Sequence, residues 1–162
     1  MKKKYLYIVL FIVGLVLIDQ VSKLLVVNYL SDKIVLINNF FSLDYVKNTG
    51  AAFGFFSGNI FFLVLITLAL VIYLIYELKQ NIDKKFNLVF IILIISGAIG
   101  NLIDRVFRGF VVDFISFILF NSQMPVFNIA DIFVTCGVAG LIFVIFKEEK
   151  VWKSILLLKK MH

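Results

Sequence analysis

Residues 60–76 read IFFLVLITLALVIYLIY and contain no charged residue. An α-helix rises about 1.5 Å per residue, so about 20 mostly apolar residues are needed to cross the hydrocarbon core of a bilayer. Comparable apolar runs extend over residues 5–27, 86–103 and 129–146. The sequence therefore predicts four transmembrane helices.

The composition has the bias of an integral membrane protein. Hydrophobic residues make up 62% of the 162 residues, and the mean hydropathy is +1.07, whereas soluble domains contain about 45–50% apolar residues. Four spans use most of this length, which leaves no room for a separate soluble domain. We expect one integral membrane domain over residues 1–162.

The basic residues predict the orientation of the spans. Eleven of the 16 Lys and Arg residues lie in the N-terminal tail, the connection after the second span and the C-terminal tail. Cytoplasmic segments carry an excess of Lys and Arg, and four spans place both termini on one side, so we expect both termini in the cytoplasm. The first span resembles a signal peptide, but no small-residue cleavage site follows it, and we expect it to remain as an anchor.

The connections between the spans have different patterns. Residues 34–37 and 40–47 favour β-structure, the latter with a mostly period-two alternation, and predict a small sheet outside the membrane. We expect the second outer connection, which contains Asp113, to be a loop. Residues 151–160 mix bulky apolar and basic side chains and are expected to lie on the inner membrane surface.

Several classes of function are disfavoured. The net charge of +6 comes from short Lys clusters between apolar segments, so we do not expect nucleic-acid binding. The one cysteine, Cys136, excludes an internal disulfide, and we interpret it as a packing residue. The one histidine, His162, is the last residue, which leaves no plausible imidazole for a zinc site or a Ser-His-Asp triad.

Two acids, Asp113 and Asp131, lie in strongly apolar surroundings near the outer ends of the predicted spans. A carboxylate at membrane depth is energetically costly and indicates a functional site. If the second outer loop folds back on the fourth helix, the two carboxyl groups approach closely and share one proton. One carboxylate then activates water while the other polarises a carbonyl. The alternative is a structural pair or a helix-terminus cap, with Asp131 favoured near a helix N-terminus.

Two further clusters have both a functional and a structural interpretation. Asp19 and Lys23 are spaced i, i+4, so they either neutralise each other or support a site. Asn101, Asp104 and Arg105 share one end of the third span. For these three, a buried network that fixes the helices is favoured slightly over direct chemistry.

The segment from Lys47 to Gly54 follows a predicted strand and contains Asn48, Gly50 and Gly54. Glycines at four-residue spacing are common helix-packing motifs in membranes. A tight turn that brings the backbone close to a substrate is the interpretation we favour.

Taken together, five motifs in this order resemble those of lipoprotein signal peptidase, also called signal peptidase II, an aspartic peptidase family (A8). They are Asp19-Gln20-x-x-Lys23, Asn48-Thr49-Gly50-Ala51-Ala52-Phe53-Gly54, the segment from Gly97 to Arg105, Val111-Val112-Asp113-Phe114 and Phe127-Asn128-Ile129-Ala130-Asp131. The resemblance covers nearly the whole chain. One departure is Ser96, where the family usually has glycine, and it puts the helix packing there in doubt.

The resemblance implies an all-α membrane protein of four transmembrane helices, with a small extracytoplasmic β-sheet and a short outer helix or loop. It implies an endopeptidase of the bacterial cytoplasmic membrane, with its active site at the outer leaflet, that cleaves prolipoproteins before a diacylglyceryl-modified cysteine. Asp113 and Asp131 match the catalytic dyad. The matched supporting residues are Asp19, Lys23, Asn48, Gly50, Ala52, Asn101, Asp104, Arg105, Asn128 and Ala130.

The implied partners are lipidated prolipoproteins, membrane lipids and peptide-like inhibitors of the globomycin type, with a monomeric enzyme and no cofactor or metal. Two other interpretations carry less weight. A proton-coupled transporter would also contain intramembrane carboxylates, but here the acids gather at one leaflet. A purely structural bundle would use the polar residues only to fix helix register.

Overall fold

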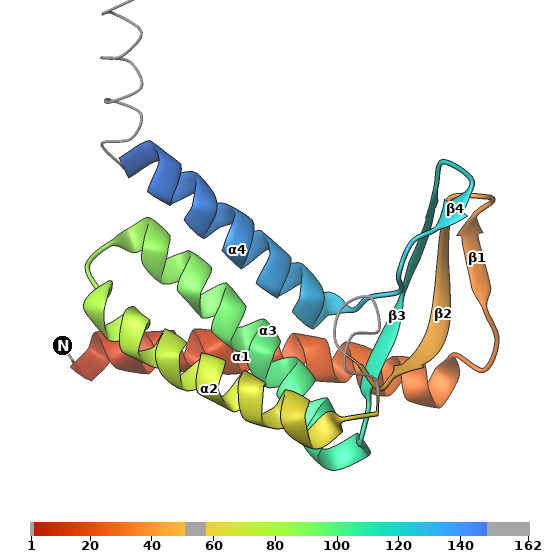
Figure 1. Cartoon of the computed structure of the whole chain (residues 1–162), viewed down its shortest axis with the longest axis horizontal. Coiled ribbons are helices and arrows are strands. Elements are labelled where there is room, and N and C mark those ends of the chain that lie inside the picture. Colours follow the sequence, from red (N-terminus) through yellow and green to blue (C-terminus); the bar gives the residue numbers. More distant parts are fainter. Residues whose placement is uncertain (1, 51–57, 149–162) are drawn as a thin grey trace, which may run out of the picture.

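The computed structural model describes residues 2–50 and 58–148. Four long helices alternate with short strands along the chain (Figure 1). The elements are α1 (Lys2–Tyr29), β1 (Ile34–Ile37), β2 (Phe41–Asn48), α2 (Ile60–Gln80), α3 (Lys85–Arg108), β3 (Val111–Leu119), β4 (Ser122–Gln123) and α4 (Ile129–Glu148). Ala52 and Gly54 of the second motif, and the tail segment 151–160, lie outside the described residues.

All four helices are long and apolar enough to cross a membrane, so this is a multi-pass membrane protein. Each observed helix contains one predicted apolar run and extends beyond it by one or more turns in places. The central helix is α3, because half of its apolar window is buried, against 17% for each of the others. Lipid-facing surface on α1, α2 and α4 explains their many exposed apolar side chains.

Small residues on α3 allow the close approach of α4. A Cβ added at Gly97 would clash with the backbone oxygen of Ala130 and would lie 2.7 Å from Val134 Cγ2. Small residues at such positions let helix backbones approach in membranes. Ser96 is accommodated beside Gly97, because it is fully buried and its hydroxyl donates to the Ile92 carbonyl oxygen at 2.8 Å.

The sheet is antiparallel, has the strand order β1-β2-β3-β4 and lies at the end of the helices away from the N-terminus (Figure 1). The strands predicted at residues 34–37 and 40–47 are confirmed as β1 and β2. The expectation of a loop around Asp113 is wrong, because Asp113 is the third residue of β3 and pairs with Val46 of β2. Its flanking residues are buried on both faces of the strand. They therefore lack the alternation that marks a half-exposed strand.

Apolar packing fixes β3 against the end of α1. Val112 and Phe114 cluster with Val26 and Leu30, which lie at and just beyond the last turns of that helix. Residues 124–128 then lead to α4 without helix, joined to β3 by a bridge between Ile115 and Phe127. No short helix beyond the four is present in the ranges 2–50 and 58–148. The bridge thereby ties the start of α4 to β3, the strand that carries Asp113.

Candidate active site

The two acids singled out in the sequence lie on different elements and line one cavity. Asp113 is on β3 and Asp131 is the third residue of α4. The cavity has a volume of about 650 Å³. Asn48, Asn101, Arg105 and Thr135 also line it, and most of the remaining wall is apolar. The fold therefore joins residues from four separate motifs at one site.

Side-chain amides hold the Asp113 carboxyl group from both sides. Asn48 Nδ2 donates to Asp113 Oδ2 at 2.8 Å, and Asn128 Nδ2 donates to Asp113 Oδ1 at 2.6 Å. Asp113 is only 2% exposed. Both oxygens are thus fixed by neutral donors in a buried position.

Asp131 is held by one amide and by the start of its own helix. Asn101 Nδ2 donates to Asp131 Oδ1 at 2.7 Å. Asn128 N donates to Asp131 Oδ2 at 3.1 Å, and Asp131 N donates to Asn128 Oδ1 at 3.0 Å. This reciprocal pair is a capping box at the N-terminus of α4. The capping interpretation of Asp131 and its place in the cavity are therefore compatible.

Each of the three amides has its orientation fixed by a group that can only donate. The amide oxygen of Asn48 accepts from Gly50 N at 2.9 Å, and that of Asn128 accepts from Asp131 N. The amide oxygen of Asn101 accepts from the Lys23 ammonium at 2.9 Å. A flipped amide would place N–H against N–H, so each NH₂ group must face a carboxylate of the site.

Burial raises the pKa of the Asp113 carboxyl group from 3.8 to about 6, and the nearby Asp131 acts in the same direction. The hydrogen bonds from Asn48 and Asn128 lower this pKa. The balance leaves Asp113 able to hold a proton near neutral pH. A carboxyl group in that range is suited to exchange protons with a substrate.

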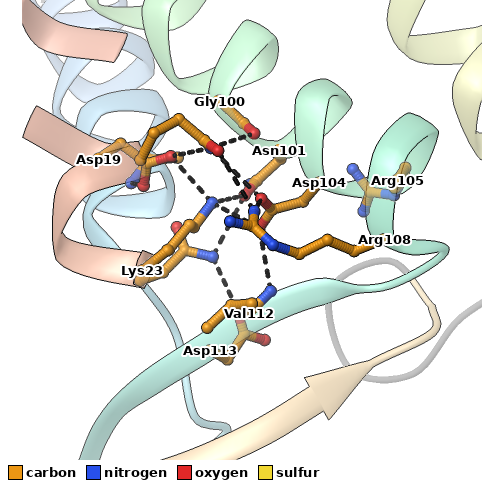
Figure 2. A network of polar contacts seen from close by, with 12 residues as sticks. Asp19, Lys23, Gly100, Asn101, Asp104, Arg105, Arg108, Val112 and Asp113 are labelled. Atoms are coloured by element: carbon orange, nitrogen blue, oxygen red, sulfur yellow. Dashed lines mark hydrogen bonds and ion pairs between the residues drawn. The ribbon is translucent and has the colours of Figure 1, made fainter. Parts of the chain in front are cut away.

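Beside the cavity, Lys23 lies at the centre of a fully buried ion cluster (Figure 2). Its ammonium group is 2.9 Å from Asp19 Oδ2 and 3.1 Å from Asp104 Oδ2. Arg108 also contacts Asp104. Because both acids and Lys23 are removed from water, this cluster depends on complete pairing.

The ion cluster also holds the backbone next to each acid of the cavity. Asp104 Oδ2 accepts from Val112 N at 3.0 Å, one residue before Asp113. Asp19 Oδ1 accepts from Ala130 N at 2.9 Å, one residue before Asp131. The same buried charges thus connect α1 and α3 to β3 and α4.

Arg105, which lines the cavity, is hydrogen-bonded to Gly50. Arg105 Nη2 donates to the Gly50 carbonyl oxygen at 3.1 Å, and the guanidinium group lines the cavity with both acids. Gly50 is buried and lies two residues after the end of β2. A cation facing two carboxyl groups favours at least one of them in the ionised form.

Some site residues could not be singled out from the sequence. Gln20 Nε2 donates to the Gly100 carbonyl oxygen at 3.0 Å, and Arg108 joins the ion cluster. For Arg108, the four-residue spacing from Asp104 is the feature of the sequence that could have predicted its place in the cluster.

The interpretation of Cys136 as a packing residue is wrong, because it is exposed and lines the cavity with Thr135. In residues 2–50 and 58–148, no group of three or more His, Cys, Asp or Glu side chains is arranged to hold a metal ion.

A family model described as signal peptidase (SPase) II matches residues 11–147. The chain belongs to the signal peptidase II family. It is 45% identical over 149 residues to the lipoprotein signal peptidase of Clostridioides difficile (strain 630), covering 90% of this chain and 97% of that protein. It is 42% identical over 146 residues to the lipoprotein signal peptidase of Clostridium tetani (strain Massachusetts / E88), covering 88% of this chain and 93% of that protein.

Two solved structures are similar in fold and sequence. Both are described as bacterial membrane enzyme structures, at 2.3 Å and 1.9 Å resolution. The first has a TM-score of 0.82 and the second 0.79, each at 36% identity. They cover 88% of this chain and 88% and 94% of their own chains. The arrangement of helices and sheet is therefore shared with these membrane enzyme structures.

Proposed function

We propose that this protein is a membrane aspartic endopeptidase that removes signal peptides from bacterial prolipoproteins, acting as a single domain over residues 1–162. Asp113 and Asp131 are the catalytic residues. One observation carries the proposal. Two carboxyl groups from distant parts of a signal peptidase II chain line one largely apolar cavity, each held by amide donors.

In the proposed reaction, the two acids share one proton and act on a water molecule. The ionised carboxylate removes a proton from water as the water oxygen attacks the scissile carbonyl carbon. The protonated carboxyl group donates to the carbonyl oxygen, which becomes the hydroxyl of a tetrahedral intermediate. When the C–N bond breaks, a proton passes to the leaving amine and the acid pair is restored. The pair titrates jointly, so its two pKa values belong to both acids.

The surrounding residues support this chemistry by position. Asn48, Asn101 and Asn128 hold the carboxyl groups, and donors fixed in advance avoid reorganisation during the reaction. Arg105 borders the place where an extended substrate backbone would lie, and its guanidinium group is held by the Gly50 carbonyl oxygen. Ala52, which the family resemblance also assigns to the site, lies outside the described residues.

The cavity wall fits an apolar, membrane-held substrate. Met124, Val126, Ile132 and Val134 contribute to it, alongside the two acids. A signal peptide helix and a diacylglyceryl-modified cysteine are both soluble in the bilayer, so a site at the ends of the helices can receive them together. We therefore propose cleavage directly before that cysteine.

The distribution of charge supports a location in the bacterial cytoplasmic membrane with both termini in the cytoplasm. Eleven of the 16 basic residues would then be cytoplasmic. The sheet and the catalytic pair would lie at the outer leaflet, at the far end from the N-terminus. We propose that the enzyme acts as a monomer and is blocked by peptide-like inhibitors of the globomycin type.

The direct test uses the purified chain in lipid vesicles with a precursor that carries the diacylglyceryl group and the same precursor without it. We expect cleavage of the lipidated precursor alone, and its loss when a peptide-like aspartic protease inhibitor is added. Mass spectrometry of the products identifies the bond that is cut. Equal cleavage of both precursors would contradict the proposed substrate, and cleavage that resists the inhibitor would contradict the aspartic mechanism.

A further inference from the structure

The far end of the sheet carries apolar side chains that no other described element covers. All four residues of β1 (Ile34–Ile37) are 48–53% exposed. Successive residues of a strand point to opposite faces, so apolar groups are uncovered on both faces of this strand. Its outer edge has no partner strand among the described residues. An edge of this kind invites aggregation in water and is normally protected by charge or proline.

The turn between β3 and β4 adds the most exposed aromatic side chain of the described chain. Phe120 is 100% exposed. Phe120 and Asn121 have φ angles of 51° and 59°, and two-residue turns of this type favour Asn, Asp or Gly. Asn121 fits that preference and Phe120 does not. A bulky residue that opposes the local backbone preference and buries nothing within the protein is explained by a contact outside it.

The position of the sheet indicates what that contact is. β1 begins five residues after the end of α1, a membrane-length helix, so the sheet lies at the boundary of the bilayer. In Figure 1 the strands run across the direction of α1, and the turns of both hairpins extend sideways beyond the end of that helix. Side chains at those turns are therefore placed beside the helices at the level of a lipid surface. Lys33, exposed beside β1, is suited to anionic headgroups.

We propose that β1, Phe40, Leu119 and Phe120 form an interfacial patch that inserts into the headgroup and upper acyl region of the bilayer. Apolar and aromatic side chains flanked by Lys are typical of elements that lie in this region. The patch is attached firmly to the strand that carries Asp113. Phe117 of β3 stacks on Phe41 with ring centroids 4.8 Å apart and meets Phe40 edge-on at 5.3 Å.

Insertion of the interfacial patch would fix the depth of one side of the cavity in the membrane. Phe120 lies seven positions after Asp113 along an extended segment, about 23 Å at 3.3 Å per residue. Lipid contact at the turn would hold the distal end of β3 while α1 holds the proximal end through Val112. Membrane contact by the patch does not require peptidase activity, so the two proposals can fail separately.

Tryptophan fluorescence tests the membrane contact in the full chain. Trp152, the one tryptophan of the sequence, is replaced by Phe, and Phe120→Trp is introduced. The protein is placed in phosphatidylcholine and phosphatidylglycerol vesicles with lipids brominated either near the headgroup or near the chain end. Ile72→Trp, at an exposed position in the middle of α2, is the control for a deep position. Free N-acetyltryptophanamide is the control for water.

We expect Phe120→Trp to show blue-shifted emission, stronger quenching by the shallow bromines than by the deep ones, and weaker acrylamide quenching than the water control. Ile72→Trp should show the reverse preference between bromines. Emission like that of free tryptophanamide, without quenching by either lipid, would overturn the proposal. A blue shift that occurs only when a precursor protein is added would also overturn it, because the patch would then bind protein.

A second pair of variants removes any dependence on how Phe120→Trp folds. Phe40→Trp reports from the neighbouring turn, and Phe120→Asn in the same chain suits the left-handed backbone while removing the aromatic ring. We expect Phe40→Trp to be quenched by shallow bromines and this quenching to fall when Phe120→Asn is added. Unchanged quenching in the double variant would refute the anchoring role of Phe120.

Discussion

Two groups of carboxylates lie at the same end of the helices and have opposite kinds of partners. Asp19 and Asp104 are paired with the Lys23 ammonium group. Asp113 and Asp131 accept hydrogen bonds from amides and a backbone N–H, and within the described residues no ion pair involves either of them. A neighbouring cation brings a compensating charge to a buried carboxylate, whereas neutral amide donors fix its position without one.

The difference shows how support and chemistry are separated in this fold. The ion cluster accepts hydrogen bonds from the N–H groups of Val112 and Ala130, each one residue before a proposed catalytic acid. Lys23 also sets the orientation of the Asn101 amide that holds Asp131. The acids that pair with Lys23 therefore position the two acids of the cavity.

The largest effect is expected from removing a carboxyl group of the cavity. Asp113→Asn or Asp131→Asn keeps the size of the side chain but removes the group that exchanges protons, so cleavage of a lipidated precursor should fall to background. Asp83→Asn is the control, because Asp83 lies in an exposed turn and pairs only with Lys4. Product formation on gels reports activity. Undiminished cleavage by either cavity variant would remove that residue from the catalytic pair.

Replacing an acid of the ion cluster by asparagine should mainly lower the stability of the protein. Asp104→Asn leaves Lys23 and Arg108 without their shared counter-charge, which costs about 3–5 kcal/mol in buried pairs. Asp113→Asn leaves no cation unpaired and should cost much less. Thermal unfolding in detergent at pH 7 measures both. Equal losses of stability would show that the two groups of acids do not differ in the way described.

The pH dependence of stability sharpens this contrast. The pKa of Asp113 is raised to about 6 in the folded protein, so its contribution to stability is fully present below about pH 4 and is lost as the pH rises through 6. The wild type should lose up to about 3 kcal/mol from this group over that range. Asp113→Asn should lack this component, and an unchanged pH dependence in the variant would contradict the assignment.

A smaller effect on stability and cleavage is expected from a substitution in the contact between α3 and α4. Gly97→Ala would push a Cβ into the Ala130 backbone and against Val134. Overpacking of this kind costs about 1–3 kcal/mol, and it should displace Asp131 and reduce cleavage. Gly14→Ala on α1 has open space around the added Cβ and should be neutral or stabilising by up to about 1 kcal/mol. Melting temperatures that fall equally would argue against close packing at Gly97.

The smallest effect is expected from one amide donor. Asn48→Ala removes a hydrogen bond that lowers the pKa of Asp113, so that pKa should rise above 6. Because the pair works with one shared proton, the alkaline limb of the pH–rate profile should then move to higher pH, and the rate at a fixed pH on that limb should rise about tenfold if the pKa rises by one. Asn59→Ala, which removes only the cap of α2, should leave the profile in place. A profile unmoved by Asn48→Ala would show that this amide does not tune the acid.

The sequence could predict much of this structure, but not all of it. The motif residues Asn48, Asn101, Asp113 and Asp131 meet at one cavity as their polar character in apolar surroundings suggested. The strand around Asp113 was missed, because a segment buried on both faces has no alternation. Cys136 was misread for a related reason, since an apolar helix does not reveal which of its sides faces a cavity.

The sequence by itself determined the four spans and the set of polar residues, because hydrophobicity sums locally along the chain and an acid in an apolar run is conspicuous. Only the tertiary structure decided which acids meet cations and which meet amides. Asp19 and Ala130, which hydrogen bond to each other, are 111 residues apart. Charge pairing depends on distances of a few Å, and such distances between remote residues are set by the packing of α1, α3, α4 and the sheet.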